Sequence, residues 1–347
     1  MAEEKVRFAV VGVGGVGRWH AERLHAARNA ALVGICDVDA ERLQQVGDRL
    51  GVSWRTTSYE EVLACEDVEA VVVALPNYLH APVSVAALRA GKHVLCEKPM
   101  ARTLSEAEEM AAASRQSGRK LMVHFNYRFT PAAMALHEVT QSGRLGQVYH
   151  ARSWWHRTRG IPGLGGWFTR KECSGGGPLV DLGVHRLDLA LWLMGYPRPA
   201  AVTAATHNYL GKAIAARAGA EFDVEDMATA FIRFADGATL VLEASWAANG
   251  ELPEEMWTQV YGTQAGIIHR NVAGRYEFEA LLFAEQGGHY GPAPLTLPPA
   301  VETPQEHFAR CLIEGREPLV TLEQALTTMR IIDAAYRSAE RRQEVHL

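Results

Sequence analysis

Six residues near the N-terminus, Gly12-Val13-Gly14-Gly15-Val16-Gly17, constrain the fold more than any other feature of the chain. They follow a valine-rich apolar run, residues 6–11, that is typical of a strand buried on both faces. They open a helical pattern over residues 15–27. In such a strand–turn–helix unit the first glycine allows a tight turn, the second lets a pyrophosphate approach the backbone, and the third permits close helix–strand packing. The six residues therefore predict a dinucleotide-binding turn.

Strand and helix patterns continue to alternate through the first 124 residues. Further strand-like runs cover residues 31–36, 53–56, 68–75, 93–96 and 120–125, and helical patterns cover 40–50, 80–90 and 105–117. Ser105 and Glu108 form a capping-box pattern at the start of the last of these helices. Alternation of this kind builds an α/β fold with a doubly wound parallel sheet.

After residue 125 the pattern changes to longer strands of alternating polarity, interrupted by a buried helix and a glycine-rich loop over 158–177. This predicts an α+β domain with a large, mostly antiparallel sheet. We expect an NAD(P)-binding Rossmann domain over residues 1–124 and a substrate-binding and oligomerisation domain over 125–347. Packing of the last helix, residues 321–342, back on the first domain is left open.

Charge and cysteine content exclude some function classes. The net charge of −5 gives no electrostatic reason to expect nucleic acid or an anionic membrane surface. No apolar run reaches the length that spans a bilayer, and the first residues lack the pattern of a signal peptide. The five cysteines are scattered without a Cys-x-x-Cys pair. We therefore expect reduced thiols, a cytoplasmic protein and no metal site.

Asp37 ends the second strand, 20 residues after Gly17, where a carboxylate accepts hydrogen bonds from the adenosine ribose. Val38 and Asp39 follow, so no side chain at these two positions is suited to hold a 2′-phosphate. NAD is therefore favoured, while Arg42 keeps NADP open as the alternative. Asp39 itself is expected to cap the next helix.

Two further segments end strands at the edge of the sheet where ligands bind. Leu75 and Asn77 follow the fourth strand, and Asn77 either binds the nicotinamide ribose or caps the helix beside it; His80 is a cofactor contact or a first-turn residue of that helix. Glu97-Lys98-Pro99 follows the fifth strand. We count Leu75, Asn77, His80, Glu97 and Lys98 as cofactor contacts. A lysine beside a nicotinamide can hydrogen-bond a reacting hydroxyl or relay its proton.

The segment from Gly175 to Asp188 places Asp181, His185 and Asp188 four and three residues apart on a buried helix expected to begin near Pro178. Polar residues on one stripe of a buried helix face either a cleft or one another. A histidine beside a carboxylate is a natural general base. The structural alternative is a hydrogen-bonded core histidine with capping carboxylates.

The approach to the glycine-rich loop is rich in aromatic and basic residues, which suit a hydroxyl-rich or anionic carbohydrate. Trp154 and Trp155 point to opposite faces of a strand, so at most one faces a substrate. We expect Trp155, Arg157 and Arg128 at the substrate, together with Lys98, Asp181 and His185. Arg128 can equally brace the domain junction.

These residues resemble the Gfo/Idh/MocA oxidoreductases over essentially the whole chain. The resemblance rests on the glycine turn, Asp37, Glu97-Lys98-Pro99, Asn126-Tyr127-Arg128-Phe129, the Gly175–His185 segment and Tyr261-Gly262-Thr263. It implies that Lys98, Asp181 and His185 form the catalytic group. It also implies reversible hydride transfer between a nicotinamide and a carbinol carbon of a sugar or polyol, by a homodimer or homotetramer.

Two other functions remain compatible with the same residues. One is a glycosidase in which NAD oxidises the sugar transiently. The other is a non-catalytic NAD-binding regulator, against which the complete set of Lys98, Asp181 and His185 argues.

Overall fold

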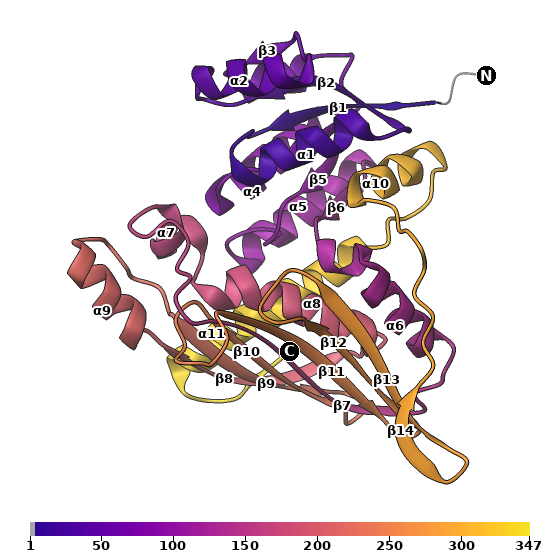
Figure 1. Cartoon of the computed structure of the whole chain (residues 1–347). Coiled ribbons are helices and arrows are strands. Elements are labelled where there is room, and N and C mark those ends of the chain that lie inside the picture. The colour runs from indigo at the N-terminus through magenta and orange to yellow at the C-terminus, as the bar shows by residue number, and fades with distance from the viewer. Residues whose placement is uncertain (1–3) are drawn as a thin grey trace. The chain divides into compact units, whose positions relative to one another are not determined.

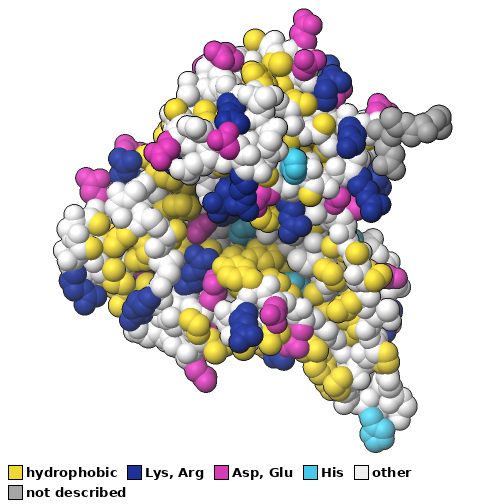
Figure 2. Space-filling model, turned by 45° about the horizontal axis from the view of Figure 1, so that its top comes forward, with side chains coloured by type: hydrophobic (Ala, Val, Ile, Leu, Met, Phe, Trp, Pro, Cys, Tyr) yellow, Lys and Arg dark blue, Asp and Glu magenta, His cyan; other side chains and the backbone are white. Residues whose placement is uncertain are grey.

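The computed structural model describes residues 4–347, which form two compact units. Residues 4–125 and Glu302–Leu326 make the first unit, and Asn126–Val301 and Thr327–Leu347 make the second. No helix within residues 4–347 is long and apolar enough to cross a bilayer. Acidic and basic side chains are interspersed over the face drawn in Figure 2, in keeping with the small net charge of −5.

The first unit is a six-stranded parallel sheet in the order β3-β2-β1-β4-β5-β6, with helices packed against it (Figure 1). The predicted doubly wound sheet is therefore confirmed. The strands are β1 (Val6–Val11), β2 (Ala30–Cys36), β3 (Arg55–Thr56), β4 (Ala70–Val73), β5 (His93–Cys96) and β6 (Leu121–Val123). The helices are α1 (Gly15–Ala26), α2 (Ala40–Leu50), α3 (Tyr59–Ala64), η1 (Asn77–Leu79), α4 (His80–Arg89), α5 (Leu104–Ser117) and α10 (Pro304–Ile313).

Two details of this unit differ from the sequence prediction. The capping box at Ser105 and Glu108 is wrong, because α5 begins one residue earlier and the side chain of Thr103 accepts the N–H of Glu106. The distant helix α10 packs beside α1, and the ring of Phe308 lies 6.4 Å from that of Phe8 on β1. The apolar core of the parallel sheet thus recruits a helix from near the C-terminus.

The second unit is a nine-stranded sheet in the order β14-β13-β12-β11-β7-β10-β9-β8-β15. The β7–β10 pair is parallel and the other neighbouring pairs are antiparallel, which confirms the predicted mostly antiparallel sheet. Its strands are β7 (Val148–Arg157), β8 (Pro199–His207), β9 (Met227–Phe234), β10 (Thr239–Ser245), β11 (Glu254–Gly262), β12 (Ala265–Asn271), β13 (Phe278–Gln286), β14 (His289–Ala293) and β15 (Val345–His346).

Helices α6, α8 and α11 lie on one face of this sheet in Figure 1. The helical elements of the unit are η2 (Asn126–Phe129), α6 (Pro131–Gln141), η3 (Trp167–Thr169), α7 (Lys171–Ser174), η4 (Leu179–Gly183), α8 (Val184–Leu193), α9 (Tyr209–Ala218) and most of α11 (Leu322–Arg341). The helix expected to run regularly from Pro178 begins with a π-helical turn, η4, before α8 continues as α-helix. A π-turn is rare and often marks a functional site.

Candidate active site

The turn after β1 has the backbone geometry that a dinucleotide phosphate requires. Gly12 has a φ of +86°, and a Cβ there would lie 2.3 Å from the carbonyl oxygen of Ala74. A Cβ on Gly17 would lie 1.8 Å from the carbonyl oxygen of Gly12, so α1 packs directly on the turn. At Gly14 a Cβ would meet only an Arg42 nitrogen at 3.9 Å. The open space beside the N-terminus of α1 suits a pyrophosphate held by backbone N–H groups.

Asp37 follows β2 and joins this turn to α2. Its Oδ2 accepts the N–H of Val13 at 2.9 Å, and its Oδ1 accepts the N–H of Asp39 at 3.0 Å and the Arg42 guanidinium at 2.9 Å. The side chain of Asp39 accepts the N–H of Arg42 and caps α2. Arg42 contacts one carboxylate oxygen of Asp37. A ribose bound there would replace the Arg42 guanidinium with its own hydroxyl groups as donors to Asp37.

A cavity of about 320 Å³ opens beside the turn. It is lined by Val13, Gly14, Gly15, Arg18, Arg42, Gln45, Val46 and Arg49. Val16 is 48% exposed on the first turn of α1. The arginines place positive charge beside the turn, where the phosphates of a dinucleotide carry negative charge. The residues present therefore fit NAD.

The segment after β4 is tied to the turn after β5 by one histidine. His80 is fully buried, with Nδ1 2.7 Å from the carbonyl oxygen of Pro99 and Nε2 2.8 Å from that of Leu75. Asn77 begins η1 and is 5% exposed. In this structure both ring nitrogens of His80 contact backbone carbonyls, so its ring positions the two loops.

The carboxylate of Glu97 is the centre of a buried hydrogen-bond network beside Lys98. Its Oε1 accepts from Nε2 of His20 at 2.8 Å and lies 2.7 Å from Nδ1 of His124. Its Oε2 accepts the backbone N–H of Lys98 at 3.1 Å. Burial opposes ionisation of Glu97, but His124 and His20 outweigh it and hold the pKa of Glu97 well below its usual range. The backbone of Lys98 is thus anchored to a fixed negative charge.

The network extends to the segment that returns near the C-terminus. The side-chain amide of Gln305 donates to Nδ1 of His20 at 2.7 Å, which leaves Nε2 of His20 to donate to Glu97. The ring of Trp19 packs against both His20 and His124. His20, Glu97 and His124 have the composition of a metal site. Their ligand atoms, however, already contact one another at hydrogen-bond distance, which favours a structural network.

In the second unit, a buried glutamate holds the glycine-rich segment before η4. The carboxylate of Glu225 accepts the N–H groups of Gly177 at 2.9 Å and Leu179 at 3.1 Å and the hydroxyl of Tyr336 at 2.8 Å. A Cβ on Gly176 would lie 2.0 Å from that hydroxyl, so only glycine fits there. Burial raises the pKa of Glu225. These contacts fix the start of the helix that carries Asp181 and His185.

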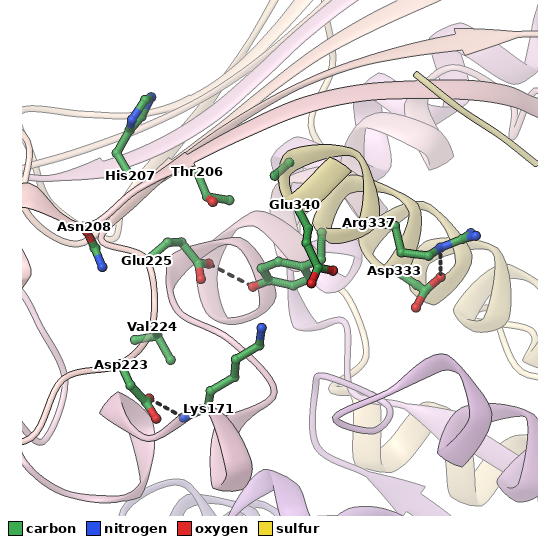
Figure 3. A pocket seen from close by; sticks show the side chains of 12 residues that line it. Lys171, Thr206, His207, Asn208, Asp223, Val224, Glu225, Asp333, Arg337 and Glu340 are labelled. Atoms are coloured by element: carbon green, nitrogen blue, oxygen red, sulfur yellow. Dashed lines mark hydrogen bonds and ion pairs between the residues drawn. The ribbon is translucent and has the colours of Figure 1, made fainter. Parts of the chain in front are cut away.

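Glu225 and Tyr336 also line an open pocket of about 490 Å³ (Figure 3). Its other lining residues are Lys171, Thr206, His207, Asn208, Asp223, Val224, Asp333, Arg337, Ala339 and Glu340. The backbone N–H of Lys171 is held by the carboxylate of Asp223, and Asp333 pairs with Arg337 at 2.8 Å. The lining of the pocket therefore contains both acidic and basic side chains, and some of these charges are neutralised by ion pairs within the lining.

Asp181 and His185 lie on η4 and the first turn of α8. The indole N–H of Trp246 donates to Oδ2 of Asp181 at 2.9 Å. His185 is 8% exposed, and its ring lies 5.1 Å from that of Tyr127 and 5.7 Å from that of Trp155. The carboxylate of Asp181 is thus held by the indole of Trp246. One turn later, the imidazole of His185 packs against the rings of Tyr127 and Trp155.

Asp188 and Arg128, both singled out from the sequence, form a separate buried ion pair. Two Arg128 nitrogens donate to the two carboxylate oxygens of Asp188, at 2.9 and 2.5 Å, and the hydroxyl of Tyr196 contacts both residues. The side chain of Arg128 is fully buried. This geometry braces η2 against α8 within the second unit, which is a different structural role from the bracing of the domain junction considered for Arg128.

Trp155 and Arg157 point to one face of β7 and share a partner on β11. The indole N–H of Trp155 and the Nε of Arg157 both donate to Oε1 of Glu254 at 2.6 Å. Tyr276 donates to the same oxygen at 2.9 Å. Trp154 lies on the other face, stacked on Trp257 with ring centres 5.3 Å apart. The expected opposite orientation of the two tryptophans is therefore confirmed.

Several residues that hold these groups were not identified from the sequence: His20, His124, Glu225, Trp246, Glu254 and Gln305. Each lies between 27 and 285 residues from its partner along the chain, so no local spacing in the sequence indicates it. His124 is the exception in part, because it lies in a predicted strand run, 120–125, and follows β6 at the same sheet edge as Glu97. That position was a usable signal.

Comparison with known proteins agrees with this geometry. Residues 6–125 match the model of the GFO/IDH/MocA oxidoreductase family with an NAD-binding Rossmann fold, and residues 133–268 match the GFO/IDH/MocA C-terminal domain. The D-glucoside 3-dehydrogenase of Escherichia coli (strain K12) is 29% identical over 360 residues, which is 100% of this chain and 99% of that protein.

Two further relatives support the assignment. A putative UDP-kanosamine synthase oxidoreductase subunit of Amycolatopsis mediterranei (strain S699) is 37% identical over 254 residues, 70% of this chain and 69% of the relative. The crystal structure of an aldose-aldose oxidoreductase from Caulobacter crescentus, complexed with glycerol, matches with a TM-score of 0.85 at 29% identity, covering 99% of this chain and 100% of that one. Since the two family models together span most of the sequence, this chain belongs to the Gfo/Idh/MocA family of NAD-binding oxidoreductases.

Proposed function

We propose that this oxidoreductase transfers hydride between NAD and a hydroxyl-bearing carbon of a sugar or sugar derivative, with Lys98, Asp181 and His185 as the catalytic residues. The observation that carries the proposal is the Asp181–His185 pair, held on a π-turn that Glu225 anchors through two backbone N–H groups. A carboxylate one turn from an imidazole is a set of groups that can accept a hydroxyl proton and stabilise the resulting charge.

In the oxidative direction, His185 accepts the proton of the reacting hydroxyl through a ring nitrogen. Lys98 donates a hydrogen bond to the same oxygen and stabilises the negative charge that develops on it. Asp181 hydrogen-bonds the substrate or orients the imidazole. NAD, when bound, supplies the acceptor for the hydride that leaves the carbon. The C–H bond breaks as the carbonyl forms, and each step runs backwards in the reductive direction.

The substrate class follows from chemistry near His185 and from the relatives. Trp155 offers an aromatic face, and Arg157 and Tyr276 surround Glu254 with polar groups that suit hydroxyl recognition. The relatives are named for oxidation of D-glucosides and for aldose oxidoreduction. Glucosides and aldoses are therefore the first candidates. The engagement of Arg128 with Asp188 supports a bracing role rather than a substrate contact.

We also propose a cytoplasmic homodimer or homotetramer. The sheet face opposite α8 carries Trp154 stacked on Trp257, with guanidinium groups of Arg152 and Arg270 over these rings. Large aromatic side chains and arginine on one face of a sheet are typical of protein interfaces. Light scattering of the purified chain tests this part, and a monomeric mass would contradict it.

The central experiment measures NADH formation at 340 nm with a panel of substrates. Methyl D-glucoside, D-glucose, 1,5-anhydro-D-glucitol and myo-inositol represent glycosides, aldoses, cyclic polyols without an anomeric hydroxyl, and inositols. Turnover with at least one class, lost in Lys98→Ala and in His185→Ala, supports the proposal. Release of the aglycone from a glucoside without net NADH would instead indicate the glycosidase.

A further inference from the structure

Arg186, next in sequence to the proposed base, is a fully buried cation that pairs with no carboxylate among the described residues. Its side chain is 0% exposed, and Nε and both terminal nitrogens are unsatisfied. Burial lowers its pKa to about 10, and this value still leaves it charged at neutral pH. A buried charge without a carboxylate partner is costly, so an arginine at this position calls for a reason.

The surroundings of Arg186 are aromatic. Its guanidinium carbon lies 4.5 Å from the ring centre of Tyr127 and 5.7 Å from that of Trp155. The phenols of Tyr127 and Tyr276 are neutral at physiological pH, because burial raises the pKa of both. The charge is therefore balanced by ring faces and not by a carboxylate.

The same unit contains a buried arginine that is fully compensated. Arg128 is equally inaccessible, but Asp188 and Tyr196 take up its donors. The fold can thus neutralise a buried guanidinium where stability alone requires it. Among the described residues, no carboxylate pairs with Arg186 in this way. We therefore look for a role of its positive charge other than stability.

The rings of Tyr127 and Trp155, which contact Arg186, also contact His185. The ring of His185 lies 5.1 Å from that of Tyr127 and 5.7 Å from that of Trp155. The cation and the proposed base therefore share the same two aromatic neighbours. An apolar layer screens a charge weakly, and a nearby positive charge disfavours protonation of an imidazole.

We propose that Arg186 is a positioning residue of the proposed reaction: its buried charge keeps His185 neutral and ready to accept the hydroxyl proton. The inference rests on the proposed function, because that function assigns the base to His185. It adds a residue whose effect reaches the substrate through another side chain.

Other titratable groups face this region from the neighbouring elements: Tyr127, His137, Arg157, Asp181, Glu254, His269 and Tyr276. Asp181 acts in the opposite sense and favours protonation of His185. Arg157 and Glu254 form an ion pair at 2.6 Å whose charges largely cancel. His269 and His137 are neutral, since burial holds the pKa of His269 well below its usual range and lowers that of His137 to about 4. Of these groups of the second unit and Arg186, only Arg186 carries a positive charge without a paired carboxylate; the charge of Lys98, which the proposed mechanism places on the reacting oxygen, is the same in every Arg186 variant.

The test titrates the histidines of the full-length chain by NMR after labelling with ¹³C,¹⁵N-histidine. The signal lost in His185→Gln identifies the residue. In Arg186→Met we expect the pKa of His185 to rise by about one unit, the shift that a unit charge at roughly 10 Å produces at an effective dielectric of about 20. Arg186→Lys retains the charge and should leave the pKa within a few tenths of a unit. Arg217→Met is the control, because it removes a positive charge from the exposed surface of α9 in the same unit.

A second measurement uses the substrate that the panel identifies. The acidic limb of the kcat/KM profile should move upward by about one pH unit in Arg186→Met and not in Arg217→Met. Thermal unfolding of Arg186→Met should occur at a similar temperature, because the loss of contacts with two aromatic rings is offset by removal of a buried charge without a carboxylate partner. If this variant fails to fold, Arg186→Gln takes its place in both measurements.

The outcomes separate the inference from the proposed function. An unchanged pKa of His185 in a folded Arg186 variant without the charge overturns the inference, whatever the activity. Full turnover in His185→Ala overturns the role of His185 as base, whatever the NMR titration shows. A raised pKa together with a shifted acidic limb supports both.

Discussion

The two units hold their proposed catalytic side chains by different physical means. Beside Lys98, the carboxylate of Glu97 meets donors from α1, from the end of β6 and from its own turn, so charge is matched by hydrogen bonds. Beside His185, two aromatic rings provide the support, and the neighbouring Arg186 stays unpaired. Hydrogen bonds fix a direction in space, whereas an apolar floor leaves a nearby charge unscreened. The hydrogen-bond network suits Lys98, a donor whose position must be fixed. The aromatic surroundings suit His185, a base whose pKa must be adjusted.

The contrast is sharpest between the two buried arginines of the second unit. Arg128→Met removes one partner of a buried ion pair and leaves Asp188 charged or forces its protonation. Breaking such a pair costs about 3–5 kcal/mol, so the midpoint of urea unfolding should fall strongly. Arg186→Met should cost little or nothing in the same measurement. Equal losses in both variants would remove the distinction between a compensated and an uncompensated guanidinium.

If Lys98 and His185 act in one reaction, loss of either side chain should abolish most of the turnover. Lys98→Ala and His185→Ala should each lower kcat by about two orders of magnitude, because each removes a group that handles charge on the reacting oxygen. NADH affinity, measured by fluorescence titration, should stay near that of the wild type. If only one variant loses turnover, the chemistry belongs to one unit and the joint mechanism fails.

Glu97→Gln tests the polar network without changing its shape. The variant loses the charge that His20 and His124 contact, and the loss of hydrogen bonds to a charged group costs about 2 kcal/mol at pH 7. The pKa of Glu97 is depressed in the folded state, so its contribution is complete above the unfolded value of about 4.3 and is lost as pH falls through the folded pKa. The stability difference between the two proteins should therefore shrink below about pH 4. A difference that does not depend on pH would show that the carboxylate is not the source.

Sequence patterns predicted the parallel sheet and the turn geometry well, because both depend on local spacing. Gly17 is required by a backbone contact with Gly12 in the same strand–turn–helix unit, and Gly12 by its positive φ in that turn as well as by a contact with Ala74 after β4. The supports of the site were harder to predict. Gln305 lies 285 residues from His20, and Glu225 lies 48 residues from Gly177, so tertiary packing alone brings these pairs together.

The same distinction explains the uneven result for α8. The buried, nearly uniform apolar helix was visible in the sequence, yet three polar residues at helical spacing divided into two groups. Asp188 pairs with Arg128, whereas Asp181 is held by Trp246 on a π-turn. A spacing argument assumes regular helix, and the π-turn changes the register of Asp181 relative to the residues after it.

The smallest predicted effect concerns the ribose end of the first unit, where hydrogen bonds again balance charge. Asp37→Ser removes the carboxylate that holds the N–H of Val13 and the guanidinium of Arg42. NAD affinity should fall about tenfold, a loss of about 1.4 kcal/mol, while NADP binding should improve because Arg42 becomes available to a 2′-phosphate. Fluorescence titrations with NADH and NADPH measure both effects. Asp39→Ser is the matched control: serine preserves the capping oxygen of α2, and the variant removes the other carboxylate that pairs with Arg42, at 3.1 Å, while the carboxylate of Asp37 stays in place. Unchanged NAD affinity in Asp37→Ser would refute the ribose assignment, and an equal change in Asp39→Ser would trace the effect to general loss of negative charge rather than to a hydrogen bond at Asp37.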